Sequence, residues 1–132
     1  MKRAAKRILI IDDSPLVLEL ARAALESAGY EVAIAETLES FEEHRKGARP
    51  DLILVDVQMP EVFGDDLAAT LRGAYGMTLP ILLLSSLSED DLASRSEAAN
   101  INGYVCKSAG VNVLLARVNE FLATNVEGSA HG

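Results

Sequence analysis

The segment LILVD at residues 52–56 places four consecutive apolar residues directly before a carboxylate, Asp56. An uninterrupted apolar run of this length is typical of a strand buried on both faces, as in a parallel sheet that is covered by helices. A charged residue at the end of such a strand contributes nothing to the core. We therefore expect Asp56 to lie at the carboxyl edge of a parallel sheet, where open α/β folds bind their ligands.

A second apolar run, ILII at residues 8–11, also ends in carboxylates, those of Asp12 and Asp13. Together with Asp56, these residues would bring three like charges to the ends of two neighbouring strands. Such a cluster is unfavourable unless a cation lies within it. Because carboxylate oxygens are hard ligands, the pattern indicates Mg²⁺ or a similar divalent ion such as Mn²⁺.

The rest of the chain alternates short apolar runs with amphipathic stretches. Strands are expected at about 6–11, 31–35, 51–56, 79–85 and 102–106. Helices are expected from Pro15, after Ser14 as N-cap, to Gly29, and then at about 38–46, 65–75, 89–99 and 110–124. Five alternating strand–helix units predict a doubly wound (βα)₅ fold of the flavodoxin-like type. Its five-stranded parallel sheet has the order 2-1-3-4-5, with helices on both faces.

Helical spacing predicts which apolar side chains face the core. In the first helix these are Leu16, Val17, Leu20, Ala24 and Leu25; in the third, Leu67, Ala68 and Leu71; in the last, Val111, Leu114, Leu115, Val118, Phe121 and Leu122. The helix at 89–99 carries few large apolar residues and should be held less firmly than the others. It is either a moving part or a simple edge helix.

Composition indicates one domain in 132 residues, which we place at 6–124 between a basic tail at 1–5 and a flexible tail at 125–132. The net charge of −8 argues against a nucleic-acid-binding role. No apolar run is long enough for a membrane span or a secretory signal. The single Cys106 excludes an internal disulfide and fits a reducing compartment. We therefore expect a cytoplasmic domain that binds neither membrane nor nucleic acid.

The expected strand ends bring several reactive groups to one crevice. These are the three carboxylates, the hydroxyl of Ser85 after the fourth strand, and the ammonium of Lys107 after the fifth. Such a set suits Mg²⁺ better than zinc, since it contains no Cys or His ligand. It also suits phosphoryl transfer, in which a carboxylate attacks phosphorus while cations and a hydroxyl stabilise the equatorial oxygens.

Several segments resemble the response-regulator receiver domain of two-component signalling, over roughly residues 6–124. The matching segments are IIDDS at 10–14, DLILVDVQMP at 51–60 with Gly64 following, LPI at 79–81 leading to Ser85, and GYVCK at 103–107. The resemblance implies that Asp56 accepts a phosphoryl group from a phosphohistidine on a sensor histidine kinase or phosphotransfer protein. It also implies that the domain catalyses only its own phosphorylation and slow dephosphorylation, and is not otherwise an enzyme.

The resemblance assigns further roles by position. Asp13, Asp56 and the backbone carbonyl of Gln58 would ligate the metal, with Asp12 acting mostly through bound water. Lys107 would pair with the phosphoryl oxygens, Ser85 would move to bond them, and Tyr104 would move inward. A downstream protein would bind the face formed by the helix at 89–99, the strand at 102–106 and the helix at 110–124. The chain would be a monomer or a phosphorylation-dependent dimer.

Residue 108 departs from the family pattern, because Ser108 follows Lys107 where the family usually has proline, commonly after a cis bond. A cis bond costs about 3–4 kcal/mol before serine, against about 0.5–1 kcal/mol before proline. We therefore predict either a trans bond with a rearranged loop or a strained cis bond. Gln58 and Leu87 should flank the water that hydrolyses the acyl phosphate, and the apolar Leu87 should not help to orient it.

Two other functions remain open at this point. A pseudo-receiver would keep the fold and signal by protein interaction without phosphate; the intact acidic residues and Lys107 argue against it, whereas Ser108 keeps it open. An aspartyl-phosphate phosphatase normally needs an acidic residue two positions after its nucleophile, and here that position holds Gln58. The pattern fits a free-standing receiver and one cut from a larger protein equally well.

Overall fold

A computed structural model describes residues 5–56, 64–73, 79–85 and 102–131 of the chain. Its five strands are β1 (Arg7–Ile11), β2 (Glu31–Ala35), β3 (Leu52–Asp56), β4 (Ile81–Ser85) and β5 (Gly103–Cys106). All neighbouring strands pair in parallel, in the order β2-β1-β3-β4-β5. The fold class, the strand order and the five strand positions predicted from the sequence are therefore confirmed.

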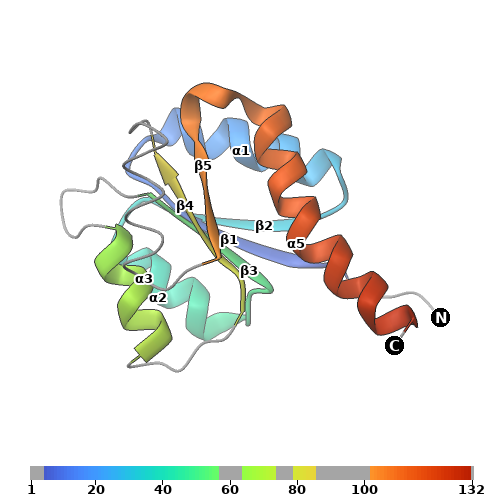
Figure 1. The fold of residues 1–132 in the computed structure, drawn as a ribbon. Coiled ribbons are helices and arrows are strands. Elements are labelled where there is room, and N and C mark those ends of the chain that lie inside the picture. Colours follow the sequence, from blue (N-terminus) through green and yellow to red (C-terminus); the bar gives the residue numbers. More distant parts are fainter. Residues whose placement is uncertain (1–4, 57–63, 74–78, 86–101, 132) are drawn as a thin grey trace.

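Helices cover both faces of this sheet (Figure 1). The helices α1 (Pro15–Ser27) and α5 (Val111–His131) pack on one face, and α2 (Leu38–Gly47) and α3 (Gly64–Gly73) pack on the other. A 3₁₀ turn at Lys107–Ala109 connects β5 to α5. The helix expected at 89–99 lies outside the described residues.

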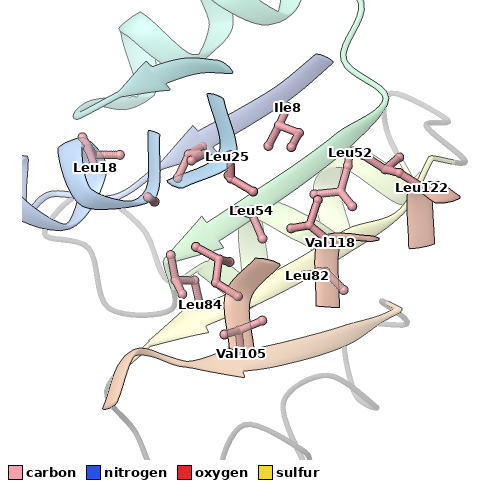
Figure 2. Close-up of a cluster of buried hydrophobic side chains, with 13 residues drawn as sticks. Ile8, Leu18, Leu25, Leu52, Leu54, Leu82, Leu84, Val105, Val118 and Leu122 are labelled. Atoms are coloured by element: carbon pink, nitrogen blue, oxygen red, sulfur yellow. The ribbon is translucent and has the colours of Figure 1, made fainter. Parts of the chain in front are cut away.

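The central strands are buried on both faces, as the apolar runs predict. All five residues of β3 and of β4 are buried. Because side chains alternate along a strand, Leu52 and Leu54 pack with α1 and α5, whereas Ile53 and Val55 pack on the α2 and α3 side. Figure 2 shows the first of these clusters, in which Leu18 and Leu25 of α1 and Val118 and Leu122 of α5 meet the sheet. This two-sided burial fixes the strand ends that carry the polar residues.

The start of α1 follows the predicted pattern. The N–H of Val17 donates to the Ser14 hydroxyl at 3.4 Å, Pro15 takes the first helical position, and the chain turns at Gly29 with φ +97°. The hydroxyl of Ser14 therefore satisfies one of the free N–H groups at the helix start. Since β1 ends at Ile11, this cap also fixes the short connection that carries Asp12 and Asp13.

The buried face of α1 differs from the predicted one. Leu18, Ala21 and Leu25 are buried, whereas Leu16 and Leu20 are 69% and 54% exposed. The prediction is confirmed for Leu25 and for the partly buried Val17, and it was wrong for Leu16 and Leu20. It failed there because α1 is apolar over more than one face, and Val17 and Leu20 line a hollow beside α5. That hollow measures about 170 Å³ and also borders Val105, Lys107 and Val111.

The last helix also differs from its prediction. Leu114, Val118 and Leu122 are buried as expected, and Leu115 and Phe121 are partly buried. Val111 is 42% exposed, because it lies in the first turn of α5 and borders the hollow.

The C-terminal end of α5 also differs from the prediction. The helix continues to His131, where a flexible tail at 125–132 was expected. The sequence lacks an apolar stripe there, but it also lacks proline, and Gly128 costs a helix only about 1 kcal/mol. Extending an existing helix is far easier than nucleating one, so the hydrogen-bond ladder continues.

In the part of the chain that the structure describes, no helix combines the length and the apolar content needed to cross a bilayer.

Candidate functional site

The carboxyl edge of the sheet brings Asp12 and Asp56 together. Ile11 pairs with Val55 in the parallel register of β1 and β3, so each aspartate follows its partnered residue at the same edge. Asp12 is fully buried and Asp56 is 2% exposed, whereas Asp13 is exposed. One carboxylate oxygen from each of the three residues lies within 4.8 Å of the others. The acidic cluster predicted from the strand ends is therefore present.

Asp12 is held by the local backbone. Its N–H continues the β1–β2 ladder by donating to the Ala35 carbonyl at 3.1 Å, and its Oδ1 accepts the N–H of Ser14 at 2.8 Å. A side-chain oxygen that accepts the N–H two residues later forms an Asx turn. Asp12 is therefore fixed in orientation by the same short segment that starts α1.

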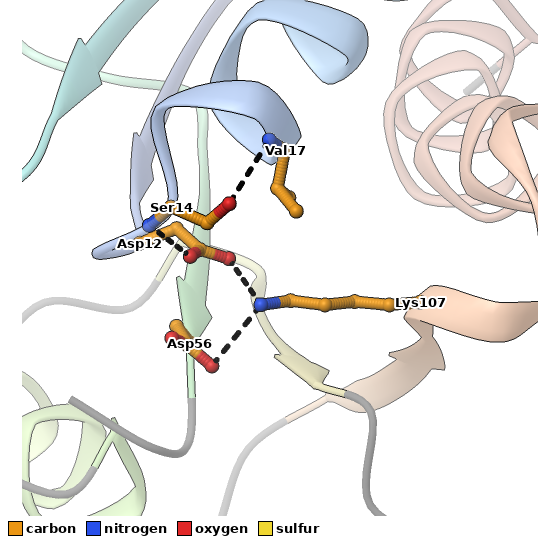
Figure 3. A network of polar contacts seen from close by, with 5 residues as sticks. All are labelled: Asp12, Ser14, Val17, Asp56 and Lys107. Carbon is orange, nitrogen blue, oxygen red and sulfur yellow. Dashed lines mark hydrogen bonds and ion pairs between the residues drawn. The ribbon is translucent and has the colours of Figure 1, made fainter.

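Lys107 reaches into the cluster from the loop after β5 (Figure 3). Its Nζ lies 2.7 Å from Oδ2 of Asp12 and 3.6 Å from Oδ1 of Asp56. Both contacts are ion pairs, and among the described residues Oδ2 of Asp12 has no partner in hydrogen-bond geometry. In this state the ammonium is held chiefly by Asp12, so it compensates the charge of Asp56 less completely.

The cluster fits a hard divalent cation. Three carboxylates and one ammonium leave two uncompensated negative charges, and two of the carboxylates are buried. Opposite ligands of Mg²⁺ lie about 4.2 Å apart, so the 4.8 Å spread requires a small adjustment or one ligand bound through water. Asp12 suits the water-mediated role, because its Oδ1 and Oδ2 already contact Ser14 and Lys107.

Ser85 and Tyr104 lie on the neighbouring strands. Ser85 is 1% exposed and ends β4, one position after Leu84, which pairs with Asp56. Tyr104, in β5, is half-buried and packs against the apolar cluster on the α2 and α3 side. Ser85 therefore lies at the acidic edge, as its place at the end of a strand predicted, whereas Tyr104 lies two residues before the end of β5.

The loop after Lys107 takes the first of the two predicted forms. No peptide bond among the described residues is cis, so Lys107 and Ser108 are joined by a trans bond. The chain forms a 3₁₀ turn and reaches α5 through Gly110, at φ +94°. Gln58 and Leu87, which were expected to flank the site, lie outside the described residues.

The sequence matches the response regulator receiver domain family over residues 8–119. The chain belongs to this family. It is 32% identical over 126 residues to the phosphate regulon transcriptional regulatory protein PhoB of Pseudomonas aeruginosa, covering 95% of this chain and 55% of that protein. It is 31% identical over 122 residues to the transcriptional regulatory protein KdpE of Mycobacterium tuberculosis, covering 89% of this chain and 51% of that one. The receiver therefore spans about half the length of these relatives.

The fold likeness is equally specific. The chemotaxis protein CheY4 of Vibrio cholerae superposes with a TM-score of 0.80 at 28% identity, covering 89% of this chain and 99% of that chain. The family and the fold that the sequence segments implied are thus confirmed.

Two features of the receiver's site were missed by sequence reasoning. The Asx turn from Asp12 to Ser14 was readable from the sequence, because Asp followed by Ser two residues later is a common turn signal. The preference of Lys107 for Asp12 over Asp56 carries no sequence signal. It depends on the path of the loop between β5 and α5, which only the folded chain defines.

Proposed function

We propose that this receiver accepts a phosphoryl group on Asp56 from a phosphohistidine of a sensor histidine kinase or phosphotransfer protein, with Mg²⁺ or Mn²⁺ bound at the aspartate cluster. The observation that carries the proposal is the approach of the Lys107 ammonium to both Asp12 and Asp56 at the sheet edge. A lysine directed into three carboxylates matches the charge requirement of a phosphoryl group that is about to join them.

The metal would be held by Asp13 and Asp56 directly, together with the backbone carbonyl of Gln58, and by Asp12 through water. When bound, it would neutralise negative charge on the phosphoryl oxygens. The buried, Lys-paired carboxylate of Asp12 supports this division, because its two oxygens are already engaged.

The transfer itself is a substitution at phosphorus. An Asp56 carboxylate oxygen forms the new P–O bond as the P–N bond to the donor imidazole breaks, and the imidazole leaves with the electron pair and takes up a proton. Lys107 then moves its charge from Asp12 towards the phosphoryl oxygens, and the Ser85 hydroxyl donates a hydrogen bond to one of them. Burial of Asp56 limits the access of water to the acyl phosphate.

The phosphoryl group stays on the protein's own residue, so the domain acts as a switch and not as an enzyme with turnover. The proposed switch residues are Ser85 and Tyr104. The proposed output surface comprises the segment 89–99 with β5 and α5, and a downstream protein would bind there. A cytoplasmic location fits the partner class and the single Cys106.

Acetyl phosphate and Mg²⁺ test the proposal directly, with intact mass as the readout. We expect the parent to gain the mass of one phosphoryl group and the Asp56→Asn variant to gain none. Asp51→Asn is the matched control, because Asp51 lies just before the start of the same strand, where its carboxylate accepts the Arg7 N–H at 2.8 Å. This variant should gain phosphate as the parent does. No mass gain in the parent would favour a pseudo-receiver that signals by protein interaction alone.

A further inference from the structure

The connection from β5 to α5 depends on one glycine. Gly110 has φ +94° and ψ 166°, a backbone region that is essentially reserved for glycine. Its N–H donates to the Lys107 carbonyl at 3.4 Å, and its own carbonyl accepts the Leu114 N–H at 3.3 Å. Gly110 therefore closes the turn that begins at Lys107 and also supplies the first acceptor of α5.

The requirement for glycine at 110 comes from the backbone alone. A Cβ added there would meet no atom within 4 Å. An L-residue would thus be excluded by its dihedral angles and not by a clash. The chain could relieve the conflict only by changing the dihedral angles of the segment 107–110.

The two ends of that segment are anchored. Cys106 pairs with Ser85 in the sheet, and Leu114 and Val118 of α5 are buried in the core. Because residues 111–113 already belong to α5, a backbone change at 110 falls mainly on the three residues of the 3₁₀ turn, of which Lys107 is the first. Movement of that turn displaces the Lys107 ammonium from its position 2.7 Å from Asp12.

We propose that Gly110 is a positioning residue for Lys107. With a trans bond at Ser108, its positive φ sets the path that directs the lysine into the acidic cluster. The role in phosphoryl transfer rests on the proposed function; the role in placing Lys107 against Asp12 does not. A displacement of about 1 Å at a reacting group can lower a rate about 100-fold, so small changes in this turn matter.

Gly110→Ala tests the proposal, with Gly29→Ala as its matched control. Gly29 also has a positive φ, +97°, and a Cβ added to it likewise meets no atom within 4 Å, but it lies in the α1–β2 turn. We expect both variants to lower the urea midpoint. Only Gly110→Ala should slow phosphorylation by acetyl phosphate, by tenfold or more at saturating Mg²⁺. Equal slowing by Gly29→Ala would overturn the proposal, since the loss would then follow from general destabilisation.

A second readout does not need phosphorylation. In the absence of Mg²⁺, limiting amounts of an amine-reactive reagent label lysines according to their exposure and ion pairing, and peptide mass spectrometry gives the labelling of Lys107 relative to the exposed Lys46. This ratio should rise at least severalfold in Gly110→Ala and stay at the parent value in Gly29→Ala. An unchanged ratio overturns the proposal. If the parent takes up no phosphate, the proposed function fails and the ratio still decides the role of Gly110.

Two further variants separate positioning from loss of structure. In a Lys107→Ala background, Gly110→Ala should cause no additional loss of rate, whereas a fully additive loss would contradict positioning through Lys107. Gly110→D-Ala adds the same methyl group but favours positive φ, and it can be introduced by ligation at Cys106 without changing the sequence elsewhere. It should restore the parental rate and labelling ratio; behaviour like that of the L-Ala variant would overturn the proposal.

Discussion

At the scale of single residues, Lys107 decides the charge of the acidic cluster. Three carboxylates and one ammonium give a net charge of −2, and removal of the ammonium gives −3. Lys107 would compete with a bound cation for these carboxylate oxygens, since it lies 2.7 Å from Asp12 and 3.6 Å from Asp56. The residue that would assist phosphoryl transfer would therefore also weaken metal binding before transfer.

This competition predicts that removing Lys107 strengthens Mg²⁺ binding, although Lys107 belongs to the site. Lys107→Ala should bind Mg²⁺ about tenfold more tightly than the parent, because a like charge within a few ångströms of the ion is removed. Lys107→Arg, which keeps the charge, should stay near the parental affinity. Isothermal titration calorimetry in the absence of phosphate donors measures both. Weaker Mg²⁺ binding by Lys107→Ala would show that the lysine supports the metal site instead of competing with it.

The identity of the site residues was predictable from local sequence, and their pairing was not. Asp12, Asp56 and Ser85 each follow an apolar run, so the pattern of buried strands alone was enough to assign them to the sheet edge. The pairing of Lys107 with Asp12 depends on a trans turn and on the positive φ at Gly110, which join residues far apart in the chain. Local sequence patterns therefore do not predict the 2.7 Å distance between Lys107 and Asp12.

Among the secondary-structure elements, α1 contains leucines that look equivalent in the sequence but differ in solvent exposure. Leu16, Leu18 and Leu20 are identical in type and close together in the chain, yet Leu18 is 1% exposed and Leu16 is 69% exposed. Periodicity failed here because apolar residues occupy both the sheet-facing side and the flank near α5. Where a helix has a wide apolar surface, spacing alone does not define which part is covered.

Matched substitutions test this assignment of the α1 faces. Leu18→Ala should lower the free energy of unfolding by about 2–5 kcal/mol, because it leaves a cavity in the core between α1 and the sheet. Leu16→Ala should change it by only about 0.5 kcal/mol or less, as is usual for surface positions. Urea unfolding followed by circular dichroism measures both. A large decrease in the free energy of unfolding for Leu16→Ala with a small one for Leu18→Ala would instead support the buried face that was predicted from the sequence.

For the whole molecule, two features of the sequence are enough to predict the topology. Apolar runs with Asp at their ends predict parallel strands, and alternation with helices then leaves a doubly wound sheet. The extent of α5 could not be predicted in the same way. Its first half is fixed by Leu114, Val118 and Leu122, and the Tyr30 hydroxyl also donates a hydrogen bond to Asn119. Beyond Leu122 the apolar residues are only Ala123, Val126 and Ala130, so the sequence pattern there is too thin to predict where the helix ends.

This division of α5 predicts the effect of ending the chain after Thr124. The buried contacts of α5 among the described side chains all precede that point, so the urea midpoint should remain within error of the full-length value. Residues 125–131 are helical, so the far-ultraviolet ellipticity per molecule should fall, since helical residues and not a coil are removed. An unchanged ellipticity would support the flexible tail. A lower midpoint would mean that the end of α5 packs on the domain, and would extend its core past Leu122.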